Sequence, residues 1–77
     1  MGQAQTGHRL RKFRKSRGVT QAELAQEMGW AHESSVSRRE RGAIPMDEEE
    51  LAGIVHAVTK IVKRRQDEYT PAEVLSE

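Results

Sequence analysis

Apolar residues recur every three or four positions along most of this 77-residue chain, which is the spacing of an α-helix with one buried face. Glycines, which commonly end helices, separate the stretches that show this spacing. The pattern predicts four helices, over residues 7–17, 20–28, 33–41 and 47–68. Residues 1–7 are polar and predict a flexible N-terminal tail. The chain is therefore expected to be all-α.

The second and third predicted helices share a short turn, and the sequence specifies how the earlier helix begins and ends. Thr20 and Glu23 have the spacing of a capping box, in which each side chain accepts a hydrogen bond from the other residue's backbone N–H. Gly29 stands where a helix commonly ends in the left-handed conformation. Ala25 is small where the two helices must approach each other. Two short helices joined in this way predict a helix-turn-helix.

These residues resemble the signature of the Cro/phage-repressor (XRE-like) helix-turn-helix family. The matching residues are Thr20-Gln21, Leu24-Ala25, Gly29, Val36-Ser37-Arg38 and Glu40-Arg41-Gly42. The resemblance covers about residues 8–60 and implies a lambda-repressor-like DNA-binding domain of four to five helices, from a bacterium or a phage. Two features differ from the family pattern. The turn after Gly29 is one residue longer, and Arg39 stands where the family has an aliphatic side chain.

The resemblance implies that the third predicted helix enters the major groove of double-stranded DNA. The candidate base-contacting residues are Glu33, Ser34, Ser35, Ser37 and Arg38. Arg38 is favoured for guanine, because a planar guanidinium matches the O6 and N7 atoms of that base. Ser34 and Ser35 have an alternative role as caps of the helix. Trp30 in the turn is expected to fill the core, with stacking on nucleic acid as the alternative.

Polar and basic residues around the motif are candidates for contacts to DNA phosphates. They are Gln21, Arg14, Arg39, Arg41, Arg11 and Lys15. Gln21 resembles a family glutamine at a helix start, where free N–H groups attract anions. Arg14 also resembles a family arginine that forms a structural ion pair, here with Glu40. Arg39 either lays its stem over apolar neighbours or reaches DNA, depending on how the longer turn rotates the helix.

Charge is divided unevenly along the chain. Residues 1–42 carry nine Lys/Arg and four Asp/Glu, whereas residues 43–77 carry four and eight. A basic half is expected of a phosphate-binding surface. The acidic half supports an alternative function, in which the fourth helix binds a protein partner, as in an antitoxin.

The fourth predicted helix is longer than so small a domain can cover. Asp47 and Glu50 predict a capping box at its start. Its apolar stripe ends in Val58, Ile61 and Val62, which are expected to face a second protomer. The alternative is a break near Lys60, with a short fifth helix that folds back. Residues 61–77, which include a helix start at Thr70-Pro71, are therefore a candidate dimerisation segment.

Several other function classes find no support in the sequence. The chain has no cysteine, and its three histidines are scattered, so no metal site is expected. There is no glycine-rich phosphate loop or nucleophile motif, so neither an enzyme nor a cofactor is expected. No apolar run is long enough for a membrane span, and the protein is expected in the cytoplasm. The predicted function is a sequence-specific transcriptional regulator, a Cro-like repressor or autoregulator, that binds an inverted repeat as a homodimer.

Overall fold

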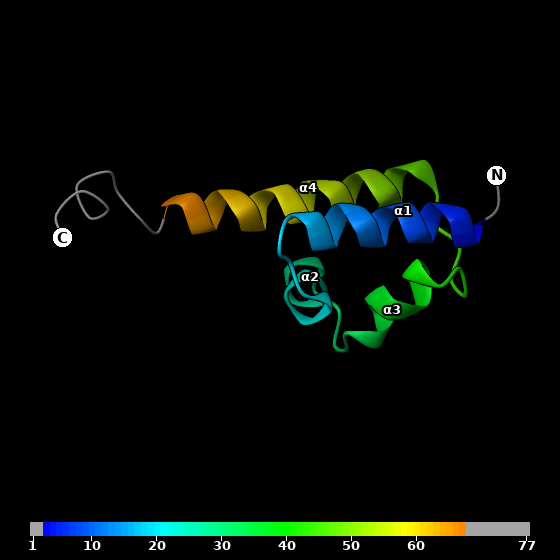
Figure 1. Cartoon of the computed structure of the whole chain (residues 1–77). Helices are drawn as coiled ribbons and strands as arrows, with labels where there is room; N and C mark the ends of the chain where they lie inside the picture. Colours follow the sequence, from blue (N-terminus) through cyan, green and yellow to red (C-terminus); the bar gives the residue numbers. More distant parts are fainter. Residues whose placement is uncertain (1–2, 68–77) are drawn as a thin grey trace, which may run out of the picture.

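Four α-helices make up residues 3–67, the part of the chain that the computed structural model describes (Figure 1). They are α1 (Gln3–Ser16), α2 (Gln21–Met28), α3 (Ser34–Glu40) and α4 (Glu48–Asp67). The two long helices, α1 and α4, run alongside each other, and the short helices α2 and α3 pack beneath them. The predicted all-α fold with a long fourth helix is confirmed.

Helix α1 begins earlier than the sequence predicts. It already includes Gln3, so the prediction of a flexible tail over residues 1–7 is wrong for residues 3–7. The residues before Leu10 contain no apolar stripe, and periodicity therefore gives no signal for them. Glutamine and alanine nevertheless favour helix, and Gly7 is buried against another helix, which holds this first turn in place.

Helix α4 is continuous from Glu48 to Asp67, so the alternative of a break near Lys60 is wrong. Asp47 caps its start, because the Asp47 Oδ1 atom accepts from the Glu50 N–H at 2.7 Å. Acidic residues fill its first turn and basic residues its last turn, which suits the helix dipole at both ends. The predicted helix start at Thr70-Pro71 lies outside the described residues.

The core lies between the helices and takes residues from all of them. Its buried apolar members are Leu10, Val19, Leu24, Ala25, Val36, Met46, Ile54, Ala57, Val58 and Ile61. Val58 and Ile61 were expected to face a second protomer, but they are only 0% and 5% exposed within the single chain. Val62 is partly buried against the same core. The predicted dimer surface is therefore wrong for Val58 and Ile61, because the stripe of α4 packs on α2 of its own chain. For Val62 and for the candidate dimerisation segment after it, the dimer contact stays a prediction.

Ion pairs fasten the second half of α4 to α2. The Arg65 guanidinium pairs with the Glu23 carboxylate and also donates to the Gly18 carbonyl at 2.8 Å. The Glu27 carboxylate lies 2.7 Å from Arg64 Nη2 and 3.5 Å from Lys60 Nζ. The basic end of α4 thus lies against its own domain instead of projecting from it.

These ion pairs predict how stability depends on pH. The Arg65 hydrogen bond lowers the pKa of Glu23 below 4.5, and the Arg64 hydrogen bond lowers the pKa of Glu27 likewise. A carboxylate whose pKa is lower in the folded state stabilises the fold above its unfolded pKa, and this contribution disappears as pH falls through the folded value. We therefore expect the melting temperature to fall as pH is lowered below about 4.5.

The control is the Glu23→Gln/Glu27→Gln variant, whose melting is followed by circular dichroism in parallel with the unmodified protein. The variant should melt at a lower temperature at pH 6. The difference between the two proteins should shrink towards pH 3, where the ion pairs are lost from both. A difference that stays constant over this range would contradict the contribution of the two carboxylates.

Candidate nucleic-acid interface

The turn between α2 and α3 has the local contacts that the sequence predicts. The Glu23 N–H donates to Thr20 Oγ1 at 3.0 Å, and the Thr20 N–H donates to Glu23 Oε1 at 2.9 Å, which completes the capping box. Gly29 adopts the left-handed conformation with φ at 77°. The next N–H, that of Trp30, returns to the Ala25 carbonyl at 2.8 Å. These bonds close α2 and direct the chain into the turn.

Backbone contacts, not serine side chains, begin α3. The Ser35 N–H donates to the His32 carbonyl at 3.1 Å, and the Val36 N–H donates to the Glu33 carbonyl at 3.0 Å. Glu33 is the N-cap residue, and no side chain forms a cap hydrogen bond there. The alternative in which Ser34 or Ser35 caps the helix is therefore wrong.

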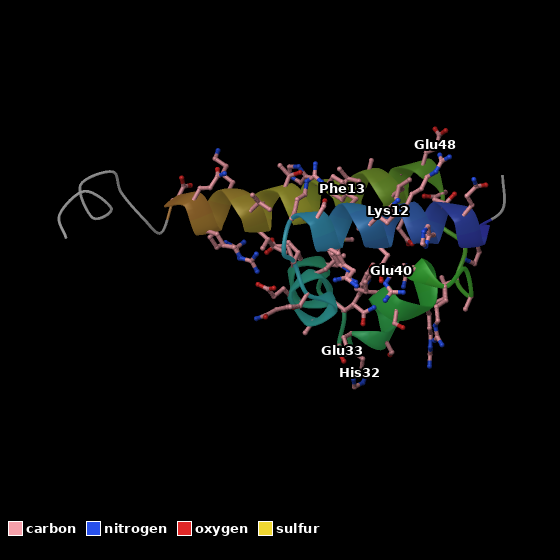
Figure 2. The ribbon with its side chains drawn as sticks, in the orientation of Figure 1. Lys12, Phe13, His32, Glu33, Glu40 and Glu48 are labelled. Atoms are coloured by element: carbon pink, nitrogen blue, oxygen red, sulfur yellow. The ribbon has the colours of Figure 1, made fainter. Side chains whose placement is uncertain are left out.

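Helical spacing sorts the residues of α3 into two faces. Val36 is 1% exposed and holds the helix on the core. The opposite face carries Ser34, Ser37, Arg38 and Arg41, which follow the spacing i, i+3, i+4 and i+7. Arg38 and Arg41 are exposed. Ser35 lies to the side of this face, and Figure 2 shows Glu33 and His32 at the tip of the molecule where α3 begins.

Arg14 and Glu40 form a buried ion pair between α1 and α3 (Figure 2 labels Glu40). Arg14 Nε donates to Glu40 Oε2 at 2.7 Å, and Nη2 donates to Oε1 at 3.1 Å. Arg14 Nη1 donates to the Val19 carbonyl at 2.7 Å, and the Arg14 side chain is only 8% exposed. The structure thus contains the predicted structural ion pair. Arg14 also lines the cationic cleft described below, so its phosphate contact stays a prediction.

Arg39 lies against the protein, so the alternative in which it reaches DNA is wrong. Its Nε donates to Glu50 Oε1 at 2.7 Å, and its Nη1 donates to the Ser35 carbonyl at 2.8 Å. Its guanidinium carbon lies 4.1 Å from the centre of the Trp30 ring. These contacts explain how arginine replaces an aliphatic residue here, because the charge is paired and the ring covers its apolar face. Trp30 itself packs against the core, as expected.

A cleft of about 520 Å³ lies near the beginning of α3. It lies between α1, the start of α2 and the residue before α3. Its lining includes the predicted phosphate contacts Arg11, Lys15 and Gln21, together with Glu33 and the chain segment around Gly18–Thr20. Arg11 and Lys15 are exposed on one face of α1. A cationic wall and the N-terminus of α2 together form a suitable site for an anion.

A second cleft, of about 200 Å³, brings in a residue that the sequence analysis missed. His8 lines it together with Arg11, Gln21, Ser37, Glu40 and Arg41. The signal was present in the sequence, because His8, Arg11 and Lys15 follow the spacing i, i+3 and i+7 and share one face of α1. Residues 3–67 hold no group of three side chains suited to a metal ion.

The fold and this surface define a helix-turn-helix protein. It has a capped helix, a tight turn and a second helix that exposes Arg38, and a cationic cleft lies near the beginning of that second helix. Residues 5–59 match the model of a family described as a helix-turn-helix domain, and the chain belongs to that family. This agrees with the resemblance to XRE-like proteins. Searches of curated proteins and of solved structures give no match.

Family membership supports a DNA-binding regulator as the general function, since a helix-turn-helix places its second helix in the major groove. Domains of this family typically bind nucleic acid and carry out no catalysis. Within residues 3–67, no helix combines the length and the apolar character needed to cross a membrane.

Proposed function

We propose that this protein is a sequence-specific transcriptional regulator, a Cro-like repressor or autoregulator, that reads the major groove with α3. The observation that carries the proposal is the outer face of α3. Its side chains Ser34, Ser37, Arg38 and Arg41 lie opposite the buried Val36. The cationic cleft reaches Glu33, the residue before the helix, and Ser37 and Arg41 line the second cleft. A recognition helix needs this combination of a base-reading face and flanking phosphate contacts.

The proposed contacts divide into two groups. Base readout falls to residues of the tip and outer face of α3, namely Glu33, Ser34, Ser37 and Arg38, with Ser35 at the side. Phosphate contacts fall to Gln21, Arg11, Lys15 and Arg41. Gln21 is also held by the protein, because its Nε2 donates to Glu40 Oε1 at 3.1 Å. That bond sets the position of the α2 start relative to α3.

We further propose that two protomers bind an inverted repeat. A single recognition helix contacts only a few base pairs, and two-fold dimers commonly place two such helices about one helical turn apart, on the order of 34 Å. The contact between protomers must lie outside Val58 and Ile61, because both are already buried within one chain. As a DNA regulator, the protein would act in the cytoplasm of a bacterial cell or an infected host.

The alternative function, a protein-interaction module, rests on a different surface. An apolar cleft of about 320 Å³ lies between α1 and α4, lined by residues that include Phe13, Leu51 and Val55. Val55 is 37% exposed, and the acidic residues Glu48 and Glu49 begin the same helix. Lys15 is one of the proposed phosphate contacts on α1. Phe13 points about 160° away from it around the helix axis, since successive residues of a helix are about 100° apart. A protein bound there would leave the proposed DNA surface open.

The test is a selection from random duplex DNA at physiological salt, followed by sequencing of the recovered duplexes. The proposal predicts an enriched inverted repeat whose half-sites are about one helical turn apart. Weak recovery without an enriched sequence, lost steeply as salt rises, would indicate phosphate binding alone and would overturn the regulator proposal. A protein partner for the cleft between α1 and α4 would then be sought.

Arg38→Ala is expected to relax the base preference at one position of each half-site, by about 1–3 kcal/mol. The guanidinium is exposed on the outer face of α3, so its removal leaves the fold intact. The same selection measures the effect. Lys63→Ala is the matched control, because Lys63 is an exposed cation on the far face of α4. An unchanged preference at every position in Arg38→Ala would exclude Arg38 from base readout.

A further inference from the structure

The second cleft, where α1, the start of α2 and the end of α3 meet, has an unusual balance of charge. The Glu40 carboxylate is its only acidic group, and both of its oxygens already accept hydrogen bonds. Arg14 neutralises that carboxylate from the buried side. Arg11 and Arg41 line the cleft and are exposed to solvent. The cleft therefore presents positive charge without a free acid to balance it.

His8 completes the lining from α1 and is exposed. The charged groups around it are Arg11 and Lys12 on its own helix, and Glu40 and Arg41 from α3 and the residue after it. From α2 the cleft receives only Gln21, which is uncharged. The acid among these groups is occupied by Arg14, so the groups nearest to His8 are mainly cationic. A protonated imidazole would add a third cation to this cleft, beside Arg11 and Arg41.

We propose that this cleft binds a phosphate of the DNA backbone, and that His8 contacts it in the protonated form, so that DNA binding becomes tighter as pH falls. The inference rests on the proposed function, because it requires DNA on this side of the molecule. Histidine is the side chain that ordinarily changes charge between pH 5 and 8. A phosphate among Arg11, Arg41 and His8 removes the repulsion between the three cations. Binding and uptake of a proton therefore favour each other.

The cleft adjoins the larger cationic cleft, since Arg11 and Gln21 line both. The larger cleft would take one phosphate, and the second cleft, nearer the C-terminal end of α3, would take another of the same backbone. Ser37 lines the second cleft and also belongs to the outer face of α3, so the proposed phosphate site borders the base-reading surface.

Contacts to phosphates carry no sequence information. Protonation of His8 would therefore strengthen binding without altering which bases are read.

The test measures the dissociation constant at pH 6, 7 and 8 at constant ionic strength, on the selected duplex and on an unrelated duplex of equal length. The unmodified protein should bind both about three- to tenfold more tightly per protomer at pH 6 than at pH 8, because binding of the phosphate and uptake of a proton favour each other. His8→Gln should lose this gain. It should also reduce the slope of log K against log salt at pH 6 by about 0.9 per protomer.

Two matched variants separate His8 from the other histidines. His56→Gln alters an exposed residue of α4, and His32→Gln alters the tip beside α3. Both should retain the gain at pH 6. A gain that persists in His8→Gln, or one that is lost in His32→Gln instead, would overturn the proposal, as would a binding constant of the unmodified protein that does not change with pH.

The two proposals fail in different ways. If the pH effect appears equally on both duplexes while no sequence is enriched, the cleft binds phosphate but the protein is not a sequence-specific regulator. If a sequence is enriched and its affinity is independent of pH, the regulator proposal holds and the role of His8 falls. Since His8 is exposed, the His8→Gln variant should melt within a few degrees of the unmodified protein, and a melting curve checks this.

Discussion

Replacing Glu40 with alanine is expected to lower the free energy of unfolding by about 3–5 kcal/mol. The side chains of Arg14 and Glu40 are 8% and 2% exposed, and two hydrogen bonds join them across α1 and α3. Without the carboxylate, the guanidinium keeps only the Val19 carbonyl as a partner, and the Gln21 amide loses its acceptor. A buried charge without a counterion is among the most costly defects in a protein interior.

A domain of this size has only about 5–15 kcal/mol of stability in total, so the loss should be visible as a large shift of the urea midpoint. Glu49→Ala is the control, because Glu49 is an exposed acid in the first turn of α4 and should change stability by about 0.5 kcal/mol or less. The double variant Arg14→Met/Glu40→Leu should regain most of the lost stability, since it leaves no stranded charge.

That comparison distinguishes two roles of the pair. If the double variant is stable and binds DNA, the ion pair is one of several ways to join α1 to α3. If it is stable but binds DNA weakly, the hydrogen bonds of Glu40 to Arg14 and Gln21 fix the orientation of α3. A loss below about 1 kcal/mol in Glu40→Ala would contradict the stranded-charge argument.

The sequence predicts best what neighbouring residues decide among themselves. Thr20, Glu23 and Gly29 determine the bounds of α2 through contacts within a few positions, and the structure contains each of those contacts. The length of α4 was also predictable, because its cap, its apolar stripe and its charged ends agree. The pairing of Arg14 with Glu40 spans 26 positions, and only the family resemblance indicated it.

The sequence could not predict which part of the molecule, or which protomer, covers a given side chain. Periodicity indicates that Val58 and Ile61 are buried, but it does not tell whether their own chain or a second protomer buries them. Arg39 presents the same difficulty, since its partners Glu50 and Trp30 lie on other segments of the chain. The spacing of Glu50 from Asp47 predicts a capping box, in which the Glu50 carboxylate would accept from the Asp47 N–H. In the structure this carboxylate accepts a hydrogen bond from Arg39 Nε.

Gly7 is a further case in which the sequence indicated the wrong role. As a glycine at the start of the first predicted helix, it marks the end of the predicted flexible tail. In the structure it lies inside α1, at the point where that helix crosses the end of α3. A Cβ atom built on Gly7 would lie 2.3 Å from the Arg39 carbonyl oxygen and 2.4 Å from that of Glu40. Only glycine permits so close an approach.

Gly7→Ala is therefore expected to destabilise the domain by about 1–3 kcal/mol, although alanine is the better helix former by about 1 kcal/mol. Real Cβ atoms essentially never approach another atom within 3.0 Å, and the obstructing atoms here belong to the backbone. Helix α1 must then move away from α3. That movement would separate Arg14 from Glu40 and shift the base-reading face relative to Arg11 and Lys15.

Gly53→Ala is the matched control, because Gly53 is also within a helix but a Cβ there would meet nothing within 4 Å. It should raise stability by about 0.5–1 kcal/mol through helix propensity alone. The same glycine-to-alanine substitution should therefore lower the free energy of unfolding at Gly7 and raise it at Gly53, and urea unfolding of both variants measures this. If Gly7→Ala also stabilised the protein, α1 would be free to shift at little cost, and its contact with α3 would not fix the recognition helix.

The Gly7→Ala variant can be less stable and yet fully folded under the conditions of a DNA-binding assay. Weak DNA binding under those conditions would show that the close approach of α1 and α3 positions the DNA-reading face.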